Sequence, residues 1–113
     1  MSTSVPSFAS LLLSLDVHVD ENNAHHQTIT NINANKVSIT AIAETLGWEH
    51  PDTLNQLNAL VDLYLKAHCS EYAERLCHRL RLAFKRTYAP DNFIHANVSI
   101  NMGIALNQQM KYK

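Results

Sequence analysis

The stretch that decides the fold runs from Gly47 to Asn92 and reads GWEHPDTLNQLNALVDLYLKAHCSEYAERLCHRLRLAFKRTYAPDN. Its apolar residues recur at steps of three and four, which is the spacing of one face of an α-helix. A polar turn at residues 68–70 interrupts the pattern, so the stretch predicts two antiparallel helices. The phrase Gly47–His50 returns in weaker form as Ala89–Asn92 and again precedes an asparagine-bearing helix. A recurring helix pair is typical of a stacked α-repeat.

Both helices of this stretch have recognisable beginnings. Pro51 suits a first helical turn, and Asp52 or Thr53 can cap or open that turn. We expect Ser70 to be the N-cap of the second helix, with Glu71 in its first turn. The residues that helical spacing assigns to the core are Leu54, Leu57, Leu60, Val61, Tyr64, Leu65, Tyr72, Ala73, Leu76, Cys77, Leu80, Ala83 and Phe84.

The flanking segments also predict helices. Residues 1–7 form a polar leader that we expect to be disordered, and a helix follows from Phe8 to Val19. Residues 27–46 carry one apolar stripe that ends before Gly47, although a strand over 37–42 is an alternative because β-branched residues are frequent there. A last helix spans residues 94–109. The expected core residues of these three helices are Phe8, Leu11, Leu12, Leu15, Val19, Ile29, Ile32, Ile39, Ile42, Ala43, Leu46, Val98, Met102, Ala105 and Leu106.

Composition narrows the class of protein. The 113 residues suit one domain, and two glycines and three prolines favour helices over a sheet protein rich in turns. A net charge of −1 provides no basic field for nucleic acid or acidic lipid. The apolar run Phe8–Leu15 is far shorter than the ~20 residues of a membrane span. Cys69 and Cys77 are expected to be free thiols, so the sequence indicates a soluble, cytoplasmic protein.

The central stretch matches a known repeat pattern at His50-Pro51-Asp52-Thr53-Leu54, Leu57-Asn58-x-Leu60, Tyr64, Glu71-x-Ala73-Glu74, Leu76, Arg79 and Pro90-Asp91. This pattern resembles the tetratricopeptide repeat family, in the long form typical of kinesin light chains. The resemblance is clearest over 47–91, with 8–46 as a degenerate repeat and 92–113 as a half repeat or capping helix. It implies an all-α fold: a short right-handed α-solenoid of about five helices in antiparallel hairpins. His68, Ser70 and Leu80 depart from the family pattern.

The resemblance also implies a binding groove along the first helix of each pair. Helical spacing places Asn55, Asn58 and Asp62 on the polar flank of one such helix, with Asn97 and Asn101 in similar places on the last helix. An asparagine amide both donates and accepts, so it can hold the main chain of an extended peptide. Spacing alone indicates only a polar face, and exposed or turn-capping asparagines are the alternative.

Positive charge is concentrated late in the chain. The candidate basic patch, which would suit an acidic peptide or a phosphate, consists of Arg75, Arg79, Arg81, Lys85 and Arg86. A solvated helix face is the simpler interpretation of these residues.

Two groups of residues have the side chains of a metal site. His68, Cys69, Cys77 and His78 are all ligand types that zinc accepts, but they lack the tight Cys-x₂₋₄-Cys spacing. A second group comprises His18, Asp20, Glu21, His25 and His26. We expect neither group to hold a metal, and the sequence indicates no cofactor. No nucleophile has a credible base beside it, and no Gly-rich phosphate loop is present, so we expect no enzymatic activity.

These observations predict a non-catalytic interaction module, or adapter, that binds a peptide or protein segment on the concave face of stacked helical hairpins. The alternative is a homo-oligomeric assembly unit that uses the unpaired C-terminal helix, because an uncapped repeat end invites a second copy.

Overall fold

The computed structural model describes residues 7–17 and 26–111. Five helices follow one another in this part of the chain: α1 (Phe8–Ser14), α2 (His26–Leu46), α3 (Pro51–Lys66), α4 (Ser70–Thr87) and α5 (Ile94–Lys111). No strand occurs among these residues, so the all-α prediction is confirmed. The strand considered for 37–42 is wrong, because α2 runs unbroken through those residues. Residues 1–6 of the predicted leader lie outside the described part.

The first helix is shorter than predicted. Ser7 caps α1 by accepting a hydrogen bond from the Ser10 N–H at 3.1 Å. The helix ends at Ser14, because the carbonyl of Leu15 accepts hydrogen bonds from the Tyr64 hydroxyl at 2.8 Å and from Lys36 Nζ at 3.3 Å. These two donors take the place of the backbone N–H that a longer helix would supply. The predicted end, Val19, lies outside the described residues.

The turn between α2 and α3 has Gly47 and Pro51 in the predicted places, but its cap is His50 and not Asp52 or Thr53. Gly47 ends α2 with a φ of 100°, which a glycine adopts without strain. The N-cap of α3 is His50, whose ring Nδ1 accepts from the Asp52 N–H at 3.1 Å, and Pro51 takes the first helical position. Thr53 is fully buried and donates its hydroxyl hydrogen bond back to the Gly47 carbonyl at 2.8 Å. The two helices are therefore joined by side-chain hydrogen bonds as well as by packing.

The beginning of α4 differs from the prediction. Ser70 is the first helical residue and Cys69 is the N-cap, with no side-chain capping hydrogen bond. His68 has a φ of 58°, so the backbone is left-handed at this residue, in the turn between α3 and α4. The Cys69 N–H then bonds the Tyr64 carbonyl at 2.8 Å, and the Cys69 carbonyl already accepts from the Ala73 N–H at 3.0 Å. The helix therefore starts one residue before the predicted position.

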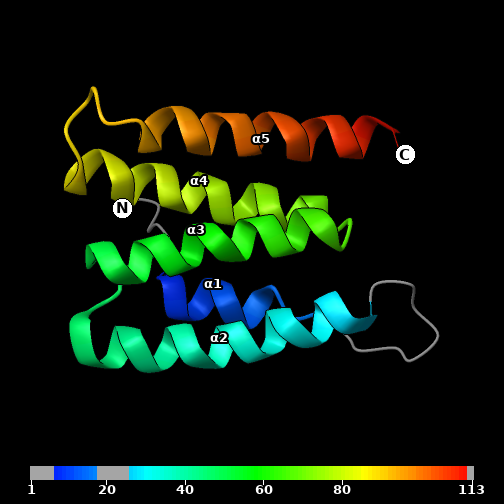
Figure 1. The fold of residues 1–113 in the computed structure, drawn as a ribbon, viewed down its shortest axis with the longest axis horizontal. Coiled ribbons are helices and arrows are strands. Elements are labelled where there is room, and N and C mark those ends of the chain that lie inside the picture. Colours follow the sequence, from blue (N-terminus) through cyan, green and yellow to red (C-terminus); the bar gives the residue numbers. More distant parts are fainter. Residues whose placement is uncertain (1–6, 18–25, 112–113) are drawn as a thin grey trace, which may run out of the picture.

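The long helices lie beside one another in a row whose edges are α2 and α5 (Figure 1). Neighbours in the chain are neighbours in space, because α3 packs against both α2 and α4, and α4 packs against α5. In addition, α5 contacts α3. The short helix α1 lies against α4: the Arg79 guanidinium stands 4.1 Å from the centre of the Phe8 ring, and Arg75 donates to Ser14 Oγ at 3.0 Å.

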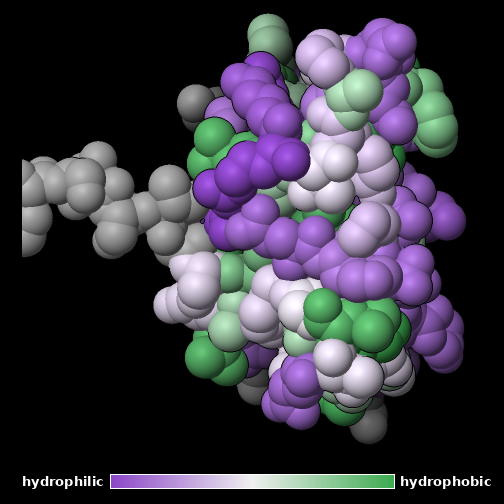
Figure 2. All heavy atoms as spheres, turned by 90° about the vertical axis from the view of Figure 1, so that its left-hand side faces the viewer, coloured by the Kyte–Doolittle hydropathy of each residue, from purple (hydrophilic) through white to green (hydrophobic). Residues whose placement is uncertain are grey.

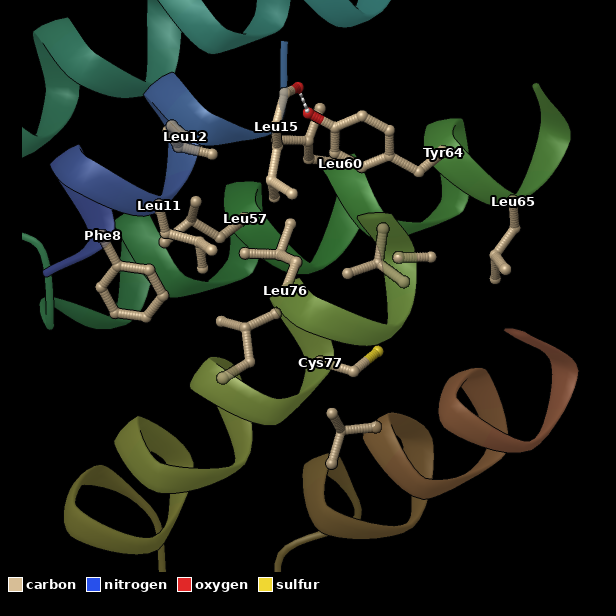
Figure 3. Close-up of a cluster of buried hydrophobic side chains, with 14 of the residues drawn as sticks. Phe8, Leu11, Leu12, Leu15, Leu57, Leu60, Tyr64, Leu65, Leu76 and Cys77 are labelled. Carbon is tan, nitrogen blue, oxygen red and sulfur yellow. Dashed lines mark hydrogen bonds between the residues drawn. The ribbon is translucent and has the colours of Figure 1, made fainter. Parts of the chain in front are cut away.

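The core is continuous from α1 to α5. Figure 3 shows leucines of α1 meeting Leu57 and Leu60 of α3 and Leu76 of α4, with the Tyr64 hydroxyl pointing at the Leu15 carbonyl. All of these side chains are at most 5% exposed. Each leucine or phenylalanine buried in this way contributes about 1.5–3 kcal/mol relative to an exposed one. This shared cluster is what holds the short α1 in place.

Four of the predicted core residues are not buried, and one of them, Ile42, is half-buried on α2. Leu106 is exposed, because the buried side of α5 is formed by Ile94, Val98, Asn101, Met102 and Ala105. Leu46 is exposed as the last residue of α2, where no neighbouring helix covers it. Tyr72 is only partly buried, and its hydroxyl reaches the Asp16 carbonyl at 3.3 Å.

Candidate functional site

Three of the asparagines predicted to line a groove meet where α3 and α5 contact each other. Asn58 Nδ2 donates to Asn97 Oδ1 at 3.0 Å, and Asn101 Nδ2 donates to the same oxygen at 3.4 Å. Asn101 is buried, whereas Asn97 is exposed. The Oδ1 atom of Asn58 is buried and accepts no hydrogen bond from the described residues. The amides therefore link the two helices through the oxygen of Asn97.

The other two predicted groove residues, Asn55 and Asp62, are exposed on α3. With Asn58 they follow at steps of three and four, so all three lie along the same flank of the helix. Asn55 and Asp62 extend the polar row in both directions from Asn58. The row is thus a structural feature, and its use by a ligand stays a prediction.

The five residues of the candidate basic patch do not share one surface. On the helical spacing of α4, Arg75, Arg79 and Arg86 lie on one side, and Arg81 and Lys85 lie about a third of a turn away around the helix. Arg75 donates a hydrogen bond to Ser14, and Arg79 and Arg86 form ion pairs with Glu49. These three side chains are therefore engaged within the protein. Arg81 and Lys85 are exposed. The structure therefore divides the predicted patch into two sets, with two side chains in the second.

Glu49 is the centre of a small ionic cluster at the end of the molecule that carries the α2–α3 and α4–α5 connections (Figure 1). Arg86 binds both of its carboxylate oxygens at 3.1 Å, and Arg79 Nη2 lies 3.7 Å from Oε2. Burial lowers the pKa of Arg79, and the Glu49 carboxylate opposes that change. Figure 2 looks at this end of the molecule and shows a band of hydrophilic side chains across it. The cluster fixes the turn at 47–50 against α4 and leaves little free charge for a ligand.

The zinc group considered from the sequence is not brought together. Cys77 is fully buried between helices, whereas His68 and His78 are exposed. No three His, Cys, Asp or Glu side chains in residues 7–17 and 26–111 are placed to hold a metal ion. In the second group, only His26 is described; His18, Asp20, Glu21 and His25 lie outside the described residues.

The two thiols are free, and they differ in accessibility. Burial raises the pKa of both thiols, that of Cys77 to about 12, so Cys77 stays a protonated thiol near neutral pH. Cys69 is half-buried at the α3–α4 turn. We expect an aromatic disulfide reagent to label Cys69 in the folded protein and Cys77 only after unfolding in urea. Equal labelling rates for the two thiols in the folded protein would contradict the buried position of Cys77.

A hollow between α1 and α2 was not foreseen. It has a volume of about 520 Å³ and is lined by Ala9, Leu12, Leu13, Lys36, Val37, Thr40, Ala41, Glu44 and Trp48. We call it the α1–α2 groove. Leu13 is 81% exposed and Val37 is 73% exposed, so two large apolar side chains stand at its rim. The run Leu11–Leu12–Leu13 is the signal that could have revealed it, because three consecutive helical residues cannot all face one core.

The walls of the groove have a regular pattern. On α2, Val37, Ala41 and Glu44 follow at steps of four and three, and Trp48 closes the same end as Glu44. Lys36 is mostly covered and is engaged with Leu15 and Asp16 at 3.3 and 3.9 Å. Glu44 is exposed and forms no ion pair with a described residue. The groove therefore offers an apolar floor, and the Glu44 carboxylate at its Trp48 end has no ion-pair partner within residues 7–17 and 26–111.

No protein-family model, curated protein or solved structure matches this chain. None of the described helices combines the length and the apolar character that crossing a membrane requires.

Proposed function

We propose that this protein is a non-catalytic interaction module that binds a segment of another protein in the α1–α2 groove. The observation that carries the proposal is the exposure of Leu13 and Val37 on either side of this hollow. Large apolar side chains that face each other across a groove, rather than scattered singly, are typical of protein-binding surfaces. A helical partner that places its own apolar face there would bury both side chains.

The groove chemistry specifies the kind of segment. Ala9 and Ala41 are small and leave room for apolar side chains of a partner, and Trp48 offers a flat apolar wall. Glu44 would pair with a lysine or arginine near the end of the segment that reaches Trp48. We therefore infer that the ligand is an amphipathic helix with leucine-like residues on one face and a basic residue at one end.

The tetratricopeptide-like organisation is also proposed, for α3 to α5. In its support, α3 and α4 form a hairpin, and α5 packs on both of them as the first helix of a following unit would. The position of α1 departs from such an array, because α1 contacts α4 as well as α3. The α3–α5 face with its asparagine row is the second candidate surface, and it would bind an extended main chain through the exposed Asn55 and Asn97.

Trp48 makes the test direct, because it is the only tryptophan and it lines the groove. The probe is a synthetic amphipathic helical peptide without tryptophan, with leucines along one face and lysines along the other. We expect titration with this peptide to shift Trp48 emission saturably, and a scrambled peptide of the same composition to leave it unchanged.

Substitutions at the rim of the α1–α2 groove test whether the peptide binds there. Leu13→Glu and Val37→Glu lie at exposed positions, so they should keep the melting temperature while weakening peptide binding at least tenfold. Leu82→Glu, at an exposed position on α4, is the matched control and should bind normally. Binding that survives both groove variants but is lost in Asn55→Ala or Asn58→Ala would overturn the groove assignment in favour of the asparagine row.

A further inference from the structure

Trp48, which closes one end of the α1–α2 groove, belongs to the 47–50 turn and not to a helix. Side-chain contacts must therefore fix the place of its indole. One such contact is with the ring of Phe8, whose centroid lies 6.1 Å from that of Trp48 at an angle of 22° between the ring planes. Phe8 is 1% exposed and does not line the groove. The end wall of the groove is thus held by a residue of the core.

Arg79 of α4 also contacts the ring of Phe8. Its guanidinium carbon, Cζ, lies 4.1 Å from the centre of the ring, which is the geometry of a cation–π interaction. The Arg79 side chain is only 10% exposed, and a cation–π interaction is strongest when it is shielded from water. The flat guanidinium group can lie on an aromatic face, which the ammonium group of a lysine cannot do. Arg79 therefore holds the ring on which Trp48 stacks.

Arg79 contacts the turn itself as well. Its Nη2 atom lies 3.7 Å from Oε2 of Glu49, the residue that follows Trp48 in the chain. Arg86 pairs with the same carboxylate at 3.1 Å, but its side chain is 60% exposed and stands over no aromatic ring of the described residues. Arg79 is therefore linked to Trp48 through two neighbours, the ring of Phe8 and the backbone of Glu49, whereas Arg86 is linked to it through Glu49 alone.

We propose that Arg79 is a positioning residue of the α1–α2 groove: it keeps the Phe8–Trp48 stack in place and thereby raises the affinity of the groove for its helical ligand. This role rests on the proposed function, in which the groove is the binding site. Arg79 itself does not line the groove. Its charge has the opposite effect, because a positive side chain repels a basic ligand. The two effects therefore predict opposite changes in affinity when Arg79 loses its charge.

Arg79→Gln, made in the full chain, distinguishes the two effects. We expect Trp48 emission to move to longer wavelength, because the indole gains contact with water when the stack loosens. The amphipathic leucine–lysine peptide should bind about fivefold more weakly, whereas loss of the charge alone would tighten its binding. Arg79→Lys retains the charge but not the planar group, so its affinity and its emission should lie between those of Arg79→Gln and the unaltered protein. It is also the milder change, and it decides the question if circular dichroism shows that Arg79→Gln is unfolded.

Arg86→Gln is the matched control. It removes the same charge and one partner of Glu49 but leaves the contact with Phe8, so Trp48 emission should stay unchanged and the peptide should bind at least as tightly as before. Binding by Arg79→Gln that equals or exceeds that of the unaltered protein, or an equal weakening by Arg86→Gln, would overturn the positioning role. An unaltered protein that binds no peptide would contradict the proposed function instead. Unchanged Trp48 emission in Arg79→Gln would contradict the role of Arg79 in the stack whether or not the peptide binds.

Discussion

Leu57→Ala is expected to lower the free energy of unfolding by about 2–5 kcal/mol. Leu57 is fully buried in α3, where Figure 3 shows it between leucines of α1 and Leu76 of α4. Removal of its branched end takes away transfer free energy and leaves a cavity that three helices line. A small domain has only about 5–15 kcal/mol of stability in total, so this one change would consume a large part of it.

Urea denaturation followed by circular dichroism measures the effect of Leu57→Ala. The matched control is Leu13→Ala, the same chemical change at a side chain that is 81% exposed, and its cost should stay within about 0.5 kcal/mol. The two variants therefore separate burial from the loss of methyl groups in general. Equal destabilisation by both would contradict the core that α1, α3 and α4 share.

Phe8→Ala should cost about 3–5 kcal/mol, the usual range for a buried aromatic ring. Phe8 is 1% exposed, its ring stacks on Trp48 with centroids 6.1 Å apart, and the Arg79 guanidinium lies over it. The ring therefore holds the start of the short α1 to both the 47–50 turn and α4. Without it, we expect α1 to separate from the core and the α1–α2 groove to be lost.

Two readouts follow Phe8→Ala at the same time. Unfolding in urea gives the cost in stability, and Trp48 emission should move to longer wavelength because the indole gains contact with water. Phe8→Leu retains apolar volume but removes the ring contacts, so it should cost less and keep the groove able to bind the amphipathic peptide. Unchanged Trp48 emission in Phe8→Ala, with a cost below about 1 kcal/mol, would show that α1 is held by other contacts.

Much of the fold followed from local pattern. The steps of three and four in Leu54, Leu57, Val61 and Leu65 define a helix face whatever surrounds it, and all four are buried. Pro51 begins a helix and Gly47 ends one because of their own backbone geometry. The helix face and the helix ends depend only on residues that are close together in the chain, so they can be predicted from the sequence alone.

The candidate sites followed less well, because they depend on contacts between residues distant in the chain. Asparagine spacing predicted a polar row, but not that Asn58 would donate a hydrogen bond to Asn97 across 39 positions of the chain. The basic residues of α4 were predicted to form one patch, but Glu49 pairs with Arg79 and Arg86 and so separates them from the exposed Arg81 and Lys85. Similarly, Leu13 became part of a groove only because α1 lies beside α2.

The sequence by itself determined that this chain forms helices and which side of α3 and α4 is apolar, because helical periodicity is set within one or two turns. Only the tertiary structure decided that α1 lies against α4, that Leu106 of α5 stays exposed and that the asparagines pair across helices. The physical reason is that burial selects which faces meet, and that choice minimises the exposed apolar surface of the whole molecule rather than of any one segment.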